Sequence, residues 1–302
     1  MDISTKLERL QAKKIRSELL VESLKRLKRL DAAAAVQDCG TYIGFGEGGK
    51  ILEANFCKHR LCPMCGYRRS LKIYANSSKI LDKAEQMFGG QKYLFLTLTV
   101  RSCPIRELGQ TLDDMAAGFK RLINNRAWKS RVNGCMRTLE ITIDEAGENA
   151  HPHYHLILAV DQSYGRADDI RYWTTAQWGA AWAKAGRLGY NPVVWIERIK
   201  GGREKGLAET AKYLCKDTDY LIPGDEARTD RIVDALCDEL KGRRLIAYTG
   251  YLRKAQSALK IDPEGGDLTD SDTIRADIDQ VVRRCYWSAG LRKYTGKHPM
   301  YR

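Results

Sequence analysis

The sequence of 302 residues has no apolar run that approaches the ~20 residues of a membrane-spanning helix. Its N-terminal stretch, MDISTKLERLQAKKIRSELL, lacks the apolar core of a signal peptide. Its nine cysteines are an odd number, and without an export signal they indicate a reducing compartment rather than a disulfide framework. We therefore expect a cytoplasmic protein that makes no contact with a membrane.

Further absences narrow the class of function. The sequence has no internal repeat, no low-complexity linker and no Gly-x4-Gly-Lys-Ser/Thr segment of the kind that binds nucleoside triphosphates. Acidic residues are in deficit, with 38 Asp and Glu against 51 Lys and Arg, which leaves a formal net charge of +13. A soluble protein with this charge most often binds a polyanion, usually nucleic acid. The alternative is a basic surface that serves solubility alone.

Histidine is also scarce, yet three of the five histidines lie in the segment HPHYHLILAV at 151–160. Alternate side chains of a strand share a face, so His151, His153 and His155 would point the same way. The apolar residues that follow are typical of a buried central strand. Imidazoles side by side on a rigid strand commonly hold a divalent metal, whereas the alternative is a polar edge strand. Pro152 suits the start of a strand, which makes His153 and His155 the better ligands.

The cysteines are clustered as well. Cys57, Cys62 and Cys65 have the spacing C-x4-C-x2-C, and Cys39 lies upstream. Four thiolates are the ligand set of a tetrahedral structural zinc site. His59 is a candidate fourth ligand in place of Cys39, although it is very close to Cys57 in the chain. The other interpretations are a redox site and unrelated buried thiols.

Hydrophobic periodicity predicts an α+β fold, with a central antiparallel sheet and flanking helices. Strands joined by short turns alternate with amphipathic helices, and the turn residues 144–149 favour a hairpin between two of the strands. The predicted helices are 3–30, 70–88, 105–124, 167–185, 206–216, 228–241 and a last one that ends near 259; the predicted strands are 92–100, 134–144, 151–160, 191–199 and 243–252.

The predicted helix 206–216 carries a second candidate group. Glu209 and Tyr213 are four residues apart and so share a helix face, and Lys216 lies one turn beyond Tyr213. Such pairs arise by chance on solvated helices. Together with a metal-binding histidine pair in a basic protein, they fit phosphodiester chemistry. In that chemistry a tyrosinate attacks phosphorus, a metal polarises the phosphate, and a lysine stabilises its charge.

These segments together resemble the rolling-circle replication initiators of bacterial plasmids, in the HUH endonuclease superfamily, which is named for its His-hydrophobic-His motif. The resemblance spans about residues 39–250, and it is closest to the branch in which a Cys-Pro-x-Cys segment precedes the nuclease. It implies a nuclease of the RRM/ferredoxin-like type, with the histidine strand beside the strand YLFLTLTV and the tyrosine helix above both. The segments that carry the match are FCKHRLCPMC at 56–65, FLTLTV at 95–100, HPHYHLILAV at 151–160 and AETAKYLCK at 208–216.

On this resemblance the chain divides into four parts. Residues 1–36 form a basic amphipathic helix, 37–90 a zinc-binding segment with a helix, 91–260 the nuclease domain, and 261–302 a basic aromatic extension. That extension either grips DNA or packs its aromatic residues as a terminal strand. The N-terminal helix is either an interaction arm or a helix packed on the body.

The resemblance also implies a metal site. His153 and His155 match the ligands of a catalytic Mn²⁺ or Mg²⁺, with Tyr154 as the intervening hydrophobic residue. The third ligand usually comes from a neighbouring strand, and Glu140 is our choice. Glu197 and His151 are the rival candidates.

The same resemblance assigns the nucleophile. Tyr213 matches the nicking tyrosine, Glu209 the acid that activates water at termination, and Lys216 the motif lysine. The nick would leave a 5′-phosphotyrosine and a free 3′-hydroxyl that primes replication. The partners implied are plasmid origin DNA, with a hairpin at the double-strand origin and a single-stranded nick site, and a host helicase in the bacterial cytoplasm. A homodimer stays open.

Two alternatives remain at this point. The first is another enzyme of the superfamily, a transposase or a conjugative relaxase. Many of those use two tyrosines, whereas here Glu209 occupies the second position on the helix and Tyr220 lies seven residues beyond Tyr213. The second alternative is a zinc-stabilised DNA-binding regulator without catalysis, in which Tyr213 is dispensable.

Overall fold

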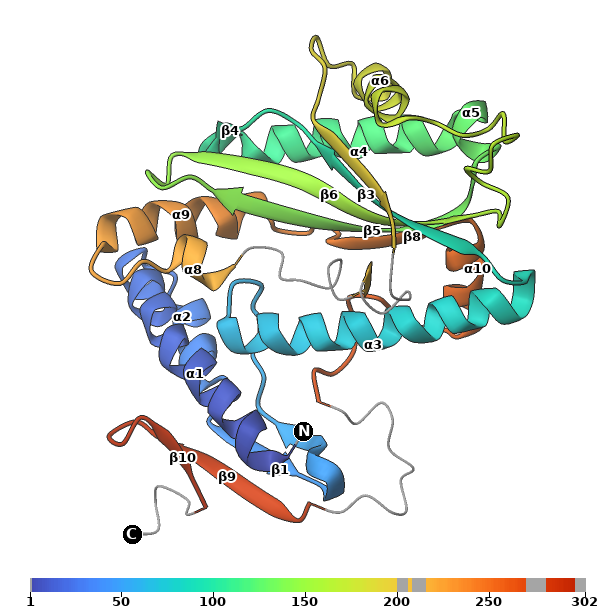
Figure 1. The fold of residues 1–302 in the computed structure, drawn as a ribbon. Helices are drawn as coiled ribbons and strands as arrows, with labels where there is room; N and C mark the ends of the chain where they lie inside the picture. The colour runs from blue at the N-terminus through green and yellow to red at the C-terminus, as the bar shows by residue number, and fades with distance from the viewer. Residues whose placement is uncertain (1, 200–205, 208–215, 270–280, 297–302) are drawn as a thin grey trace. The chain divides into compact units, whose positions relative to one another are not determined.

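The structure is a computed structural model that describes residues 2–199, 206–207, 216–269 and 281–296 (Figure 1). The chain forms two compact units. The first contains Met1–Arg69, Asp217–Asp238 and Gly265–Arg302, and the second contains Ser70–Lys216 and Glu239–Glu264. Each unit is therefore assembled from segments that are distant in the sequence. Among the described residues, no helix combines the length and the apolar character that crossing a bilayer requires.

The first unit begins with two helices where the sequence predicted one over 3–30. The chain forms α1 (Ile3–Arg26) and α2 (Leu30–Asp38). They are separated at Lys28, whose φ of 57° is left-handed and ends the first helix. Leu20 and Leu24 are fully buried, as the spacing of the leucines predicted.

The basic face of α1 packs on the same unit, which answers whether this helix is a free arm. Arg26 forms two hydrogen bonds of 2.7 and 2.8 Å to Asp230 of α9 (Glu226–Glu239). Arg29, just beyond α1, contacts Asp234 at 2.7 Å. Exposed ion pairs each contribute little to stability. Here, however, they engage arginine side chains that a free arm would need to bind a partner. The short helix α8 (Asp217–Tyr220) belongs to this unit too.

The C-terminal segment supplies strands to this unit. The sheet has the order β10-β9-β1-β2, and all of its pairings are antiparallel. Trp287 is buried and its ring lies 5.3 Å from that of Tyr294, so the aromatic residues of the extension pack within a terminal hairpin. The strands are β1 (Tyr42–Phe45), β2 (Ile51–Ala54), β9 (Arg283–Ser288) and β10 (Lys293–Thr295), with a 3-10 turn η1 (Glu47–Gly49) between the first two.

The second unit has the α+β architecture that the sequence predicted. Its antiparallel sheet has the order β7-β3-β6-β5-β8, and β4 pairs with the end of β6. Figure 1 shows α4 and α6 on one side of this sheet and α3 and α10 on the other. The strands are β3 (Lys92–Thr99), β4 (Cys103–Pro104), β5 (Val132–Ile143), β6 (Asn149–Val160), β7 (Val194–Arg198) and β8 (Ile246–Thr249). The helices are α3 (Pro63–Phe88), of which the part from Ser70 on belongs to this unit, η2 (Ile105–Glu107), α4 (Leu108–Asn124), α5 (Arg126–Lys129), α6 (Thr175–Gly186) and α10 (Gly250–Ala258).

Strand β6 lies at the centre of this sheet and divides its two faces. Tyr154 is buried on the α4 side, where its ring meets Phe119 edge-on at 5.6 Å and the buried Arg137 lies 4.4 Å above it. Ile157 and the histidines point to the opposite face, as the alternation of a strand requires. That face is covered at one end by a core of buried residues from α3 and α10, together with Ile157 and Leu207. The histidine end of the face lies outside this core.

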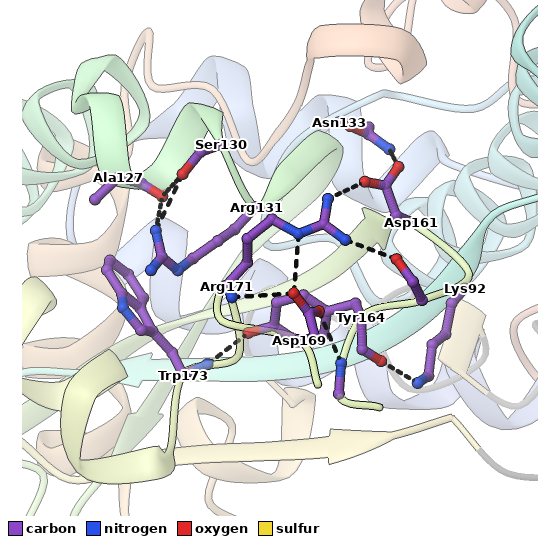
Figure 2. Close-up of polar contacts among 12 residues, drawn as sticks. Lys92, Ala127, Ser130, Arg131, Asn133, Asp161, Tyr164, Asp169, Arg171 and Trp173 are labelled. Atoms are coloured by element: carbon purple, nitrogen blue, oxygen red, sulfur yellow. Dashed lines mark hydrogen bonds and ion pairs between the residues drawn. The ribbon is translucent and has the colours of Figure 1, made fainter. Parts of the chain in front are cut away.

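The helix predicted over 167–185 begins eight residues later, at Thr175, and this prediction was wrong at its N-terminal end. The preceding loop winds around Arg171, whose guanidinium binds Asp161 and Asp169, as Figure 2 shows. The guanidinium also donates to the hydroxyl of Ser163. These local hydrogen bonds compete with helix formation. Thr174 then starts the helix with a capping box.

The strand predicted over 243–252 ends at Thr249, because the chain turns into α10 at Gly250. Gly250 has a φ of +55°, and a Cβ there would collide with the carbonyl oxygen of Asn133. Only glycine fits both the left-handed backbone and the close approach of β5.

We expect Gly250→Ala to destabilise the second unit by several kcal/mol, since backbone strain of about 1 kcal/mol adds to a clash with fixed backbone. Gly242→Ala is the matched control, because Gly242 also has a positive φ, +71°, but has open space around it. Urea unfolding followed by circular dichroism measures both. Equal midpoints for the two variants would show that the contact with β5 is unimportant.

Candidate functional site

Two groups of side chains in the described residues are placed to hold a metal ion. One is Glu140 with His153 and His155 in the second unit, and its three ligand atoms lie within 4.8 Å of one another. The other is a set of four cysteines in the first unit, whose sulfurs meet the same limit: Cys39, Cys57, Cys62 and Cys65.

The pairing of β5 with β6 builds the first group. Glu140 is directly opposite His153 in the strand register, so their side chains share a face. The Glu140 Oε2 atom lies 2.6 Å from Nε2 of His155 and 3.2 Å from Nε2 of His153. The three ligand atoms therefore converge on one point, and two imidazoles with one carboxylate are a donor set that suits a divalent cation.

The opposite edges of the two imidazoles are held by the sheet. Nδ1 of His153 lies 3.2 Å from the carbonyl oxygen of His151, and Nδ1 of His155 lies 3.1 Å from Oγ1 of Thr97. A carbonyl oxygen only accepts, so Nδ1 of His153 donates to it, and Nε2 is the ring nitrogen that faces Glu140. Phe95 stacks on His155 with ring centroids 5.4 Å apart. Contacts of this kind fix the orientation of metal-binding histidines.

The electrostatics of the group favour an ionised carboxylate. Burial opposes ionisation of Glu140, but hydrogen bonds from His153 and His155 outweigh it and hold the pKa of this carboxyl well below its usual range. Glu140 is therefore negatively charged near neutral pH. A carboxylate held between two imidazoles attracts a cation.

Of the three candidates for the third position, the structure brings only Glu140 to the histidine pair. His151 pairs with Thr142 at the strand's outer end, and its ring centroid is 5.6 Å from that of His153. Glu197 is exposed on β7, separated from β6 by β3. Neither side chain belongs to the group of converging ligand atoms in the described part of the chain.

The predicted nucleophile and its acid, Tyr213 and Glu209, lie outside the described residues. The described residues just before them are Gly206 and Leu207, which are helical and buried. Leu207 is fully buried in the core that includes Ile157, on the histidine face of the sheet. Lys216 is described and is exposed.

The cysteine group joins residues from either side of the first sheet's opening hairpin. The Sγ atom of Cys39 lies 3.5 Å from that of Cys65 and 3.6 Å from that of Cys62, and Cys57 lies 3.6 Å from Cys65. Pro63 is the first residue of α3, so Cys62 directly precedes the helix and Cys65 lies in its first turn.

Contacts among these sulfurs change their acidity. The nearest contacts, first of all with Cys39, raise the pKa of Cys62 and Cys65 and lower the pKa of Cys57. Four thiolates this close repel one another, and a bound cation removes that repulsion. The arrangement suits a metal ion better than it suits four separate thiols.

His59 is not part of this group. Its Nδ1 lies 3.3 Å from the backbone nitrogen of Leu61, and burial lowers its pKa. Among the described residues, the sulfur of Cys39 lies with those of the other three cysteines, and His59 lies outside this group.

Sequence patterns did not reveal two of the supporting residues. Lys14 is buried, and its Nζ donates to the carbonyl oxygens of Gln37 and Cys39 at 2.6 and 2.7 Å, which places a cation beside the thiols. Thr97, which orients His155, lies in a segment that the resemblance already marked. Lys14 is one of many lysines on a basic helix, and nothing in its spacing distinguishes it.

The chain is similar to known proteins over most of its length. The family described as "Replication protein" matches residues 48–295 of the chain. The chain is 34% identical to "Protein rep" of Bacillus amyloliquefaciens, over 94% of this chain and 92% of that protein. It is 36% identical to "Protein rep" of Bacillus sp, over 84% and 89%, and 31% identical to "Protein rep" of Streptococcus pneumoniae serotype 2, over 87% and 83%. No solved structure matches the chain significantly.

We expect the cysteine group to hold about one metal ion per chain, because four sulfurs converge on one point. Cys62→Ser should lose this metal and lower the thermal stability of the protein, since binding of a structural metal contributes to folding. Cys237→Ser is the matched control, as Cys237 lies in the same unit but outside the group. Elemental analysis of the purified proteins measures the metal. Full occupancy in Cys62→Ser would contradict the assignment.

Proposed function

The chain belongs to the replication protein family, a family of plasmid replication initiators, and from this premise we propose that it nicks one strand of its origin DNA with a tyrosine nucleophile. The single observation that carries the proposal is the convergence of Glu140, His153 and His155 on one face of the sheet. Leu207, the last described residue before the segment that contains Tyr213, is buried in the core on that same face.

The metal site supplies charge stabilisation. Glu140, His153 and His155 would hold a Mn²⁺ or Mg²⁺ ion, which when bound polarises an oxygen of the scissile phosphate. The three side chains are positioned in advance by the sheet, so little reorganisation is needed when the phosphate binds.

In this proposal, residues of the predicted helix 206–216 make and break the bonds. The Oη atom of Tyr213 attacks the phosphorus, the bond from phosphorus to the 3′-oxygen breaks, and that oxygen leaves as a 3′-hydroxyl after it takes up a proton. The 5′-phosphate remains on the tyrosine. Lys216 stabilises negative charge on the phosphate. Glu209 removes a proton from water so that the regenerated origin is cut at termination.

The DNA substrate fits the composition of the protein. A net charge of +13 favours binding to phosphates by counterion release, so binding should weaken steeply with salt. The proposed substrate is plasmid origin DNA with a hairpin and a single-stranded nick site. Because the sequence has no segment of the nucleotide-binding type, strand separation is assigned to a host helicase in the bacterial cytoplasm.

The cysteine group has a structural role in this proposal. Four thiolates with no position left for substrate are typical of a structural Zn²⁺ site rather than a catalytic one. The group lies in the first unit, whereas the His–Glu group lies in the second. The two metals should therefore respond separately to chelation and to mutation.

Removal of the exchangeable metal should stop nicking. We expect EDTA to abolish the nicking of supercoiled origin plasmid, with Mn²⁺ restoring it, while the cysteine-bound metal and much of the DNA binding remain. His153→Ala should lose nicking in the same assay. His151→Ala is the control, because His151 is outside the converging group and should nick at close to the parent rate. Normal nicking by His153→Ala would show that the metal assignment is wrong.

Variants of Tyr213 and Glu209 should distinguish the first nick from termination. Tyr213→Phe should abolish both the nick and the covalent attachment to DNA, because phenylalanine has no nucleophilic oxygen. Glu209→Ala should keep the nick and the adduct but impair termination, and Glu209→Tyr should trap a second adduct at the end of the cycle.

These outcomes are measured by labelled-oligonucleotide transfer to protein and by plasmid replication products. Nicking by Tyr213→Phe would favour a non-catalytic regulator with a contaminating nuclease. Clean termination by Glu209→Ala would mean that Glu209 only pairs with a neighbouring lysine.

A further inference from the structure

Trp195 differs from every other tryptophan of the chain. It is 61% exposed on β7. The structure describes all six tryptophans. Four are buried (Trp128, Trp178, Trp182 and Trp287), and Trp173 lies beneath the guanidinium of Arg131 at 4.2 Å. The fold therefore covers five of these rings and leaves one open.

Strand register places this exposed ring on the same face of the sheet as His153 and His155. Thr97 of β3 pairs with His155 on one side and with Trp195 on the other. Directly paired residues of antiparallel strands point to the same face, so Trp195, Thr97 and His155 form one row across three strands. Neighbouring strands are about 4.8 Å apart, which puts the Trp195 backbone about 10 Å from that of His155.

The ring is accessible within this row. Thr97 is small, and its Oγ1 is directed to Nδ1 of His155, 3.1 Å away. In the described part of the chain β7 is the outer strand of the sheet, so no further strand covers Trp195 on its other side. No aromatic or cationic partner of Trp195 occurs among the described residues.

Packing and edge protection do not account for this tryptophan. An indole contributes to stability when it is buried, and an exposed apolar residue on an edge strand favours aggregation. Edge strands are usually protected by charge and proline, and Pro192, Glu197 and Arg198 already serve this purpose around β7. Neither packing nor edge protection therefore explains the exposed indole on β7.

We propose that Trp195 is a stacking platform for a base of single-stranded DNA next to the scissile phosphate, an inference that rests on the proposed function. Stacking on an exposed ring is a general way to hold unpaired bases, and duplex DNA does not offer a free base face. Glu197 shares the face of Trp195 two residues away and repels phosphate. The phosphate backbone of the DNA strand therefore passes on the histidine side. One of its bases extends across Thr97 to the indole of Trp195.

Trp195 is a positioning residue in this account. It holds the strand so that the phosphate is presented at the His–Glu group, and it takes no part in bond making. Stacking depends on a ring face and not on base identity, so Trp195 contributes to affinity for single strands of any sequence. It does not read the origin.

The test uses two fluorescein-labelled probes of equal length and charge: an oligothymidylate, and a strand of abasic tetrahydrofuran nucleotides. Anisotropy titrations with the full chain at moderate salt give Kd for each probe. Trp195→Ala should weaken binding to oligothymidylate on the order of tenfold and leave binding to the abasic strand unchanged, because loss of one stacked base costs that much. Trp195→Phe keeps a ring and should stay within a few-fold of the parent.

Val193→Ala is the matched control. Val193 is 76% exposed and precedes β7 on the same alternation, so this change removes apolar surface without removing a ring. It should leave both Kd values unchanged. Thermal unfolding should be equal for all variants, because neither side chain is buried.

Equal binding of oligothymidylate by the parent and Trp195→Ala would overturn the stacking inference and leave the nicking proposal in place. Equal losses on both probes would overturn it too, since they indicate a change in phosphate contacts. Failure of the parent to bind either strand would refute the proposed function, and the inference with it.

Discussion

The pairing of β5 with β6 is the constraint on which the candidate site depends. It sets Glu140 opposite His153, and the alternation of β6 sets His155 on the same face, so three ligand atoms from two strands converge. A slip of one residue in this register would send Glu140 to the opposite face, where buried aromatic residues cover the sheet. The site therefore has the rigidity of a central sheet rather than that of a loop, which suits the precise placement of a metal ion.

The two faces of this sheet differ in what covers them. One is closed by buried aromatic side chains, among them Phe119 and Tyr154, and it anchors the strands. The other face is covered by core residues at one end and carries the candidate site at the opposite end. The core at one end includes Ile157 and Leu207, and the other end presents the histidines and the open ring of Trp195. A sheet that is packed on one side can expose polar and aromatic groups on the other without losing its register.

In the first unit, the cysteine group and α1 connect segments that are distant in the sequence. Cys39 and Cys65 lie 3.5 Å apart although 26 residues separate them, and Lys14 of α1 donates to the carbonyl of Cys39. Tyr294, from the last strand, donates to the carbonyl of Gly40 at 2.6 Å. The beginning and the end of the described chain thus meet around the cysteine group. A small unit with a modest core gains stability from such a connection.

The local pattern of the sequence alone determined much of this. The alternation of histidines before an apolar run specified their shared face, the cysteine spacing predicted a cluster able to hold a metal ion, and the segment motifs led to the replication initiators. The hairpin of β5 and β6 and residues 70–88 of α3 followed from periodicity, because they depend on residues close in the chain; periodicity did not show that α3 already begins at Pro63. The start of α6 did not, since the loop around Arg171 closes through side-chain contacts that periodicity does not report. Only the tertiary structure shows that Glu140 lies beside the histidine pair, whereas Glu197 and His151 do not. It alone places Cys39 rather than His59 with the other cysteines, and it alone shows which tryptophan stays exposed. Those outcomes depend on strand register and on the packing of segments far apart in the sequence, and these are set by the whole fold rather than by any short stretch of it.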